Sequence, residues 1–322
     1  VSTSWPYDVT HAVSEAAFMA LRVTGKRRIL LASTLHPHYR RVLATSMGDL
    51  PAELVDLPAT DGRVSADAVR DEMDSDTACV IVQSPNVFGL IEDWAGAFDA
   101  AHGEKKTLGI AVFNPIAAAL LRRPGECGAD VAVGEGQPLG IPPAFGGPHL
   151  GLFAATKKLM RKMPGRLVGR TTDADGTTGY CLTLQTREQH IRGAKATSNI
   201  CTNQGLLALR ATVYMTAMGP RGLREAAEQS YHKAHYAADE IAKLDGYDLP
   251  YAGLPFFHEF VVRCPKPAAE VIDAAAEADL LPGVDLHALG ASEHPSDLLI
   301  AVTEKRTRDE IDQLVAFLDG AG

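Results

Sequence analysis

The chain has 322 residues, of which 46% are hydrophobic and 22% are charged. This composition is typical of a globular protein with one large domain or two modest ones. The formal net charge of −9 and the pI near 5.7 argue against a nucleic-acid-binding function. The sequence has neither the eighteen or more consecutive apolar residues of a membrane span nor a secretory signal pattern, so we expect no membrane association.

The first predicted element is an amphipathic helix from Asp8 to Val23, because apolar residues recur there at helical spacing. Either Asp8 or Thr10 is suited to be its N-cap. A second helix is expected to begin within the segment His36 to Tyr39.

Three short apolar runs in the same half predict strands, at residues 29–33, 78–83 and 108–113. The run at 78–83 is continuously apolar, which is typical of a strand buried in a parallel sheet. Open α/β sheets bind ligands at the carboxyl ends of their strands. We therefore expect a ligand site near the loop at 84–89.

A segment rich in glycine and proline, GEGQPLGIPPAFGGPHLG at 134–151, follows the apolar run 129–133. Such a composition does not form a regular helix. Directly after a buried strand, it predicts a shaped loop whose backbone approaches a ligand or another protein, and we interpret it as the floor of a site.

The segment 151–155 predicts a strand, and 156–163 predicts a basic helical turn. Asp175-Gly176 between β-prone flanks predicts a hairpin. It leads into a polar run at 183–204, for which two interpretations stay open. Thr186 and Ser198 are suited to cap helices, but the run has more charged donors than caps require, which favours contact with a partner.

The C-terminal third begins with a predicted helix at 206–218, interrupted by Gly219-Pro220, and a longer helix at 222–244. Strands at 258–263 and 298–302 and helices at 268–278 and 307–318 predict a smaller α/β unit. We expect residues 1–219 to form a large domain, and residues 220–322 to form a connecting helix and a small C-terminal domain.

Four blocks carry a resemblance to a known family: 128–151, MPGRLVGRTTDADG at 163–176, LTLQTREQHIR at 182–192 and KATSNICTNQ at 195–204. They resemble subunit 1, the alpha subunit, of the two-subunit glycine dehydrogenase (decarboxylating), which is the P-protein of the glycine cleavage system. The resemblance is collinear from Trp5 to the last helix. Family chains carry a further segment before the position of Val1, so we expect an N-terminal segment to be missing here.

The resemblance implies the α/β fold of type I pyridoxal phosphate (PLP) enzymes, the aspartate aminotransferase-like fold, with a large mixed sheet and a smaller C-terminal domain. It also implies that the PLP lysine belongs to subunit 2, at a position that corresponds most closely to Pro138 here. No lysine lies between Pro124 and Thr156, and a Schiff base needs an amine. Asn114 stands where such enzymes carry an aspartate beside the pyridine nitrogen, and a neutral amide does not hold a pyridinium by charge.

The same resemblance places the cofactor phosphate of PLP-binding relatives at the start of the first helix. The family pattern there is close to Tyr-Asp-Gly, whereas this chain has Tyr7-Asp8-Val9. A Cβ at Val9 hinders close approach of a phosphate. We therefore expect this chain to have no catalytic residue, to hold no covalent PLP and to bind no metal, and we expect the PLP of the complex to sit on the partner subunit.

The implied function is that of a glycine decarboxylase subunit that is inactive alone. The reaction converts glycine and the lipoyllysine of H-protein into aminomethyl-dihydrolipoyl H-protein and carbon dioxide. The implied partners are subunit 2, in an α2β2 heterotetramer, and lipoylated H-protein. The candidate residues for contacting the partner or completing its site are Gln137, Gly146, Gly147, Arg187, His190 and Asn199. The alternative is a catalytically inert scaffold or regulator with the same fold.

Five scattered cysteines without CxxC spacing indicate buried thiols in a reducing compartment and neither disulfides nor a zinc site. They are Cys79, Cys127, Cys181, Cys201 and Cys264. We therefore predict a cytoplasmic location.

Overall fold

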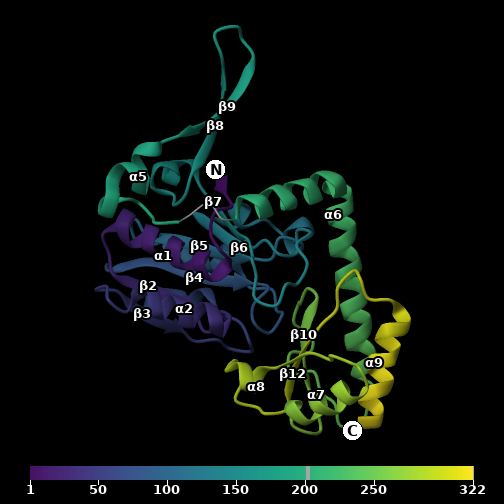
Figure 1. Cartoon of the computed structure of the whole chain (residues 1–322). Helices are drawn as coiled ribbons and strands as arrows, with labels where there is room; N and C mark the ends of the chain where they lie inside the picture. Colours follow the sequence, from purple (N-terminus) through teal and green to yellow (C-terminus); the bar gives the residue numbers. More distant parts are fainter. Residues whose placement is uncertain (201–203, 322) are drawn as a thin grey trace.

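A computed structural model of the chain describes residues 1–200 and 204–321. Its largest element is a seven-stranded sheet in the order β1-β7-β6-β5-β4-β2-β3 (Figure 1). The strands are β1 Ser2–Thr3, β2 Arg28–Ala32, β3 Glu53–Leu57, β4 Thr77–Ser84, β5 Leu108–Phe113, β6 Val131–Glu135 and β7 Gly151–Ala155. Strands β2 to β6 are parallel, whereas β7 is antiparallel to β6 and β1 is antiparallel to β7. The sheet is therefore mixed.

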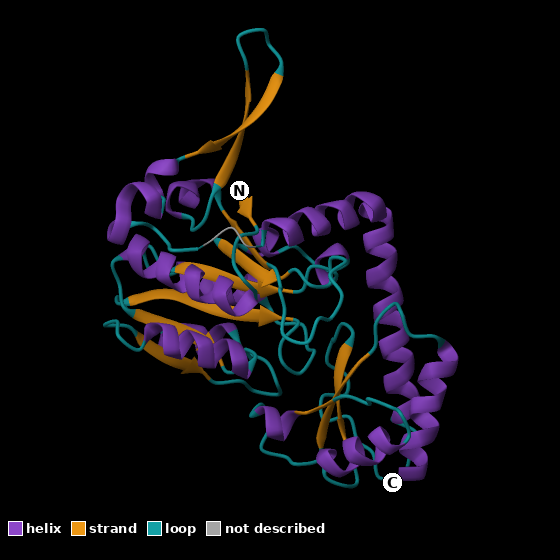
Figure 2. Ribbon diagram, in the orientation of Figure 1, coloured by secondary structure: helices purple, strands orange, loops and turns teal. Residues whose placement is uncertain are grey.

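Helices cover both faces of this sheet, and Figure 2 shows the two helices of the near face. On one face lie α1, Val9–Thr24, and α2, Pro37–Met47, and on the other lie α3, Ala66–Glu72, and α4, Trp94–His102. Along β2, Ile29 and Leu31 join the first core while Leu30 and Ala32 join the second. Burial on both faces explains why the central strands are continuously apolar rather than alternating.

The predicted first helix is confirmed. Its N-cap is Asp8, whose carboxylate accepts a hydrogen bond from the His11 amide at 2.9 Å. The helix ends at Gly25, which has the left-handed φ of 72° that favours glycine. The second helix begins after His36, within the segment where the sequence predicts it.

The predicted hairpin is also confirmed, and it projects from the rest of the chain (Figure 1). Strands β8, Leu167–Thr172, and β9, Thr178–Thr183, pair antiparallel. The Asp173 carboxylate accepts hydrogen bonds from the amides of Asp175 and Thr177, and Gly176 has φ +80°. The turn is therefore stabilised by its own side chain and glycine.

The polar run after the hairpin forms short turns. These are the 3-10 turns Gln185–Arg187 and Gly193–Lys195 with the four-residue helix α5, Gln189–Arg192, between them. The helix has Glu188 at its N-cap position and no side-chain cap, so the capping role of Thr186 is wrong. Ser198 instead donates to Glu15, and Thr202, its predicted capping neighbour, lies outside the described residues. The turn at 157–162 is likewise a 3-10 helix.

The long helix α6, Gly205–Ile241, joins the large sheet to the C-terminal part and bends where Gly219-Pro220 interrupts it. Gly219 has φ 62° and ψ 178°, which is outside the helical region. The predicted domain boundary at 219/220 stays a prediction, and it coincides with this bend. None of the described helices combines the length and hydropathy that crossing a bilayer requires.

The C-terminal part contains a three-stranded antiparallel sheet in the order β10-β12-β11. Its elements are β10 Glu259–Arg263, α7 Ala268–Glu277, β11 Val284–Asp285, α8 Leu286–Leu289, β12 Asp297–Ala301 and α9 Arg308–Ala321. Apolar residues of the sheet, α9 and the second half of α6 form a separate core. The expected smaller α/β unit is therefore confirmed as an architecture.

Candidate functional site

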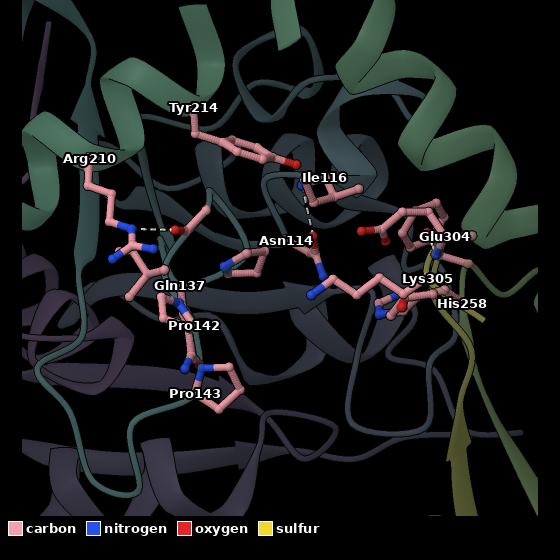
Figure 3. A pocket seen from close by; sticks show the side chains of 16 residues that line it. Asn114, Ile116, Gln137, Pro142, Pro143, Arg210, Tyr214, His258, Glu304 and Lys305 are labelled. Carbon is pink, nitrogen blue, oxygen red and sulfur yellow. Dashed lines mark hydrogen bonds between the residues drawn. The ribbon is translucent and has the colours of Figure 1, made fainter. Parts of the chain in front are cut away.

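A cavity of about 540 Å³ lies where the large sheet, α6 and the C-terminal part meet (Figure 3). One wall is the loop after β6, residues 137–143, and another is the first half of α6. The third wall comes from the C-terminal part, through residues 257–258 and 303–305. The first half of the glycine- and proline-rich loop thus lines a cavity at the carboxyl ends of β5 and β6.

Asn114 follows β5 and lines this cavity. Its side-chain carbonyl accepts hydrogen bonds from the amides of Ile116 at 2.9 Å and Ala117 at 3.2 Å. The Asn114 side chain therefore starts the 3-10 turn at 117–119, and it brings no negative charge to the cavity.

Pro138, the residue that the resemblance places nearest the PLP lysine, also lines the cavity. A proline offers no amine there. The lysine among the lining residues is Lys305, which follows β12 and is exposed. Lys305 comes from the small C-terminal part and not from the loop after β6.

Glu135, at the end of β6, satisfies backbone amides from three segments. It accepts hydrogen bonds from the amide of Val9 at 3.1 Å, of Gln137 at 3.0 Å and of Leu150 at 3.4 Å. Burial raises the pKa of the Glu135 carboxyl, although these hydrogen bonds act in the opposite direction. The carboxylate of Glu135 therefore already occupies the position beside the backbone amide at the start of α1.

These residues do not fit PLP. The loop after β6 has no amine for a Schiff base, and the residue after β5 is neutral. The amide at the start of α1, which would face a phosphate, is bonded to a carboxylate that repels a second anion.

The loop at 84–89, the other predicted ligand loop, uses its polar groups within the chain. Asn86 accepts hydrogen bonds from the amides of Phe88 and Leu90 and donates to Glu92 at 2.8 Å. Gly89 lies so close to the backbone of Glu259 that a Cβ would stand 1.9 Å from its carbonyl oxygen. The loop therefore joins the large sheet to the C-terminal part.

Arg187 is buried and bonded within the chain. Its guanidinium donates to the backbone carbonyls of Met163, of Gly165 at 2.8 Å and of Leu184 at 3.3 Å. Burial lowers the pKa of Arg187, and the neighbouring carboxylate of Glu188 partly offsets this. Arg187 thus holds the segment that precedes the hairpin.

The other candidate residues belong to different segments of the chain. Gln137 lines the cavity, whereas His190 and Asn199 are exposed on the segment after the hairpin. Gly146 and Gly147 belong to the far half of the loop, with φ of +124° and +105°, next to the fully exposed Phe145. Of the six candidates, Gln137 is the one that lines the cavity, and their contact with a partner stays a prediction.

The sequence-based prediction missed Glu135, Arg210, Tyr214, His258 and Glu304. An acid at the end of a buried strand was the signal for Glu135. The other four line the cavity from α6 and the C-terminal part, and their positions in the sequence carry no local signal of this.

Comparison with known proteins gives the family. Residues 1–318 match the family described as Glycine cleavage system P-protein. A "Probable glycine dehydrogenase (decarboxylating) subunit 1" of Moorella thermoacetica is 49% identical over 320 residues, which cover 99% of this chain and 71% of that protein. The protein of the same name from Bacillus cereus (strain AH187) is 48% identical, over 98% of this chain and 70% of its own length.

The solved structures agree. A crystal structure of glycine decarboxylase (P-protein) of the glycine cleavage system, in inhibitor-bound form, superposes with a TM-score of 0.91 at 39% identity, covering 98% of this chain and 70% of that one. A NifS-like protein, at 14% identity and a TM-score of 0.71, covers 99% of this chain and 82% of its own and shows the fold alone. The expected fold of type I PLP enzymes is confirmed, and the chain belongs to the glycine cleavage system P-protein family.

Proposed function

We propose that this chain is the subunit of glycine dehydrogenase (decarboxylating) that does not carry the cofactor. The complex would convert glycine and the lipoyllysine of H-protein into aminomethyl-dihydrolipoyl H-protein and carbon dioxide. The observation that carries the proposal is that a chain matched to the family over residues 1–318 lines its cavity after β5 and β6 with Asn114 and Pro138 and has no lysine between Pro124 and Thr156.

PLP supplies an electron sink for the carbanion left by loss of carbon dioxide. In the proposed complex the second subunit carries it, because the relatives named subunit 1 imply at least one other subunit. The residues of this chain have a different task, which is to present a rigid surface to that subunit. An α2β2 heterotetramer with lipoylated H-protein as the further partner is part of the same proposal.

The surface that we assign to the partner is the exposed apolar surface of 145–215. It comprises Phe145, Val168, Tyr180, Leu182, Ile191, Leu206, Leu209, Val213 and Met215. Tyr180 is 73% exposed and Leu206 is 75% exposed. Large exposed apolar side chains gathered on neighbouring segments are typical of interaction sites in proteins.

Two features give this surface a shape. Leu206, Leu209 and Val213 follow helical spacing of i, i+3 and i+7, so they share one face of α6. The opposite side of the helix carries Ala211 and Tyr214, which pack against the central loop. The hairpin of β8 and β9, to which Val168 and Tyr180 belong, projects from the rest of the chain (Figure 2). The hairpin and the exposed face of α6 together offer a surface suited to binding another folded subunit rather than a short peptide.

We also propose a cytoplasmic location. Cys79, Cys127 and Cys264 are buried and Cys181 is exposed, and all four are free thiols. Cys201 lies outside the described residues. Free thiols fit a reducing compartment.

The experiment that tests the partner surface places acids on the α6 face. The double variant Leu209→Asp, Val213→Asp should weaken association with subunit 2 by about 100-fold or more, since each apolar side chain contributes about 1.5–3 kcal/mol when buried and a buried carboxylate adds a penalty. Val42→Asp on α2 is the control, because Val42 is also an exposed helical valine but lies outside the surface. Affinity is measured by titration calorimetry with purified subunits. If Val42→Asp weakens association as much as the double variant does, the assigned surface is wrong.

A further inference from the structure

We propose that the apolar groove at the end of α1 binds a medium-chain carboxylic acid, with its carboxylate on Arg22 and its chain over Phe18, Leu21 and Leu50. The groove shares no lining residue with the cavity beside Asn114. The proposal goes beyond the decarboxylation of glycine and does not rest on it, because this chain alone contains every residue involved.

The groove has a volume of about 500 Å³, which is within the usual range of small-molecule sites. The last two turns of α1 form one wall, and Leu50 and Pro51, in the segment between α2 and β3, form another. Leu50 is 41% exposed although its side chain is large and apolar. A ligand chain that covers Leu50 removes this apolar surface from water, which favours binding.

Spacing along α1 places the cation beside the apolar floor. Phe18, Leu21 and Arg22 stand at positions i, i+3 and i+4 of the helix, so their side chains lie on one face. All three line the groove. The charged head and the apolar chain of one small ligand therefore contact neighbouring side chains of the same helix.

Arg22 supplies the charged group for the ligand. In the described part of the chain, its guanidinium has neither a hydrogen bond nor an ion pair. The side chain is exposed, but desolvation by its surroundings still lowers the pKa of Arg22, and the charge of Glu15 partly offsets this. A carboxylate would stabilise this partly desolvated cation, because a guanidinium binds a carboxylate through two parallel hydrogen bonds.

The other two cations that line the groove are paired within the chain. The ammonium group of Lys26 donates to the carbonyl of Lys105 at 2.8 Å, and Nε of Arg27 donates to the carboxylate of Asp76 at 3.2 Å. The carboxyl end of a helix carries partial negative charge, which by itself repels an anion. A ligand carboxylate at the end of α1 therefore depends on Arg22.

The combination of one available cation and an apolar floor defines the class of ligand. Inorganic phosphate would bind Arg22 but would leave the apolar floor uncovered, and an uncharged apolar molecule would leave Arg22 without an anion. A carboxylate with an unbranched apolar chain satisfies both parts of the lining. Octanoate is therefore the first probe.

The test is titration calorimetry of the full chain with octanoate and three matched probes. Octanoate should bind with a Kd on the order of 0.1–1 mM. Butyrate, which has a shorter chain, and 1-octanol, which lacks the charge, should each bind about tenfold more weakly or worse. Octylammonium, which has the opposite charge, should not bind measurably. Failure of octanoate to bind would overturn the proposal, and so would equal binding of octanoate and octylammonium.

The variant Arg22→Met tests the cation. It should weaken octanoate by about tenfold and leave 1-octanol unchanged, because methionine keeps an apolar stem and removes the charge. Unchanged binding of 1-octanol also shows that the variant is folded. Arg221→Met is the control, because Arg221 is exposed on α6 outside the groove. If Arg22→Met binds octanoate as the wild type does, the assignment is wrong.

The variant Leu50→Glu tests the apolar wall. It should weaken both octanoate and 1-octanol by about tenfold or more, because it places a carboxylate against the ligand chain. Leu281→Glu is the control, since Leu281 is 91% exposed in the C-terminal part. Sedimentation velocity of the wild type and both variants tests for contact between copies of this chain. Self-association that Leu50→Glu abolishes, without binding of octanoate to the wild type, would assign the groove to such a contact and overturn the proposal.

Discussion

Replacement of Glu135 by alanine should loosen three segments at once. The carboxylate accepts hydrogen bonds from the start of α1 at Val9, from the central loop at Gln137 and from the residue before β7 at Leu150. Alanine removes the acceptor without filling its place. The three amides then either donate their hydrogen bonds to water or have no acceptor.

The magnitude follows from the geometry. Two of the bonds are of normal length, at 3.0 and 3.1 Å, and the third is long at 3.4 Å. A hydrogen bond to a charged group contributes about 1.5–3 kcal/mol, but removing Glu135 also removes the cost of burying its charge. We therefore expect a net loss of about 1–3 kcal/mol in the free energy of unfolding of the large domain.

The pH dependence gives an independent check. Burial raises the folded-state pKa of Glu135 above its unfolded value of 4.5. A group with a raised folded pKa contributes stability that is fully present below its unfolded pKa and is lost as pH rises through the folded pKa. The stability advantage of the wild type over Glu135→Ala should therefore shrink as pH rises from 4.5, and Glu135→Gln should lack this pH-dependent contribution.

Hydrogen exchange at the amides of Val9, Gln137 and Leu150 measures the effect directly, beside urea unfolding between pH 4 and 8. Glu277→Ala is the control, because Glu277 is exposed on α7. If the three amides keep their protection in Glu135→Ala, the carboxylate is not their acceptor and the reasoning fails.

Two further predictions concern the cofactor and the loop tip. Treatment of the purified chain with PLP and borohydride should label no lysine stoichiometrically, because the loop after β6 has none; full labelling of one residue, Lys305 included, would contradict this. Valine is strained at the φ of +105° that Gly147 adopts, so Gly147→Val should change the shape of the loop tip and lower turnover in the reconstituted complex. Because this tip is exposed beside Phe145 and lies outside the core, thermal unfolding of the chain should change little. A large loss of stability with unchanged activity per folded complex would mean that this glycine serves the fold alone.

Local signals account for the elements that the sequence predicted. Helix α1 has a capping aspartate and a continuous apolar stripe, and the hairpin has Asp175-Gly176 at its turn. Strands β5 and β7 match their predicted bounds because clear turn residues flank them. Strand β3 was not predicted, since it lies at the sheet edge with one buried residue among five and has no continuous apolar run.

The site was predictable only in part. The composition of the central loop indicated a cavity wall, and Gln137 and Pro138 do line the cavity. The composition did not reveal that Gly146 and Gly147 lie in the exposed tip of the loop, next to Phe145. Contacts such as that of Val9 with Glu135 join residues 126 positions apart, and no local pattern encodes them.

Arg187 is a second example of a role that the sequence does not reveal. A charged residue in a polar run was expected at the surface, yet its guanidinium is buried against backbone carbonyls. An arginine that replaces missing backbone partners looks the same in sequence as an arginine that binds another protein. The fold decides between the two, and here it bonds Arg187 within the chain.

The most direct test of the account is the decarboxylation of glycine by each subunit alone and by the mixture. Release of labelled carbon dioxide from carboxyl-labelled glycine is measured with lipoylated H-protein present. We predict negligible release by this chain with added PLP, and full release only when subunit 2 is added. Full activity of subunit 2 alone would contradict it and would favour an inert scaffold, and activity of this chain alone would contradict the assignment of the cofactor to the partner.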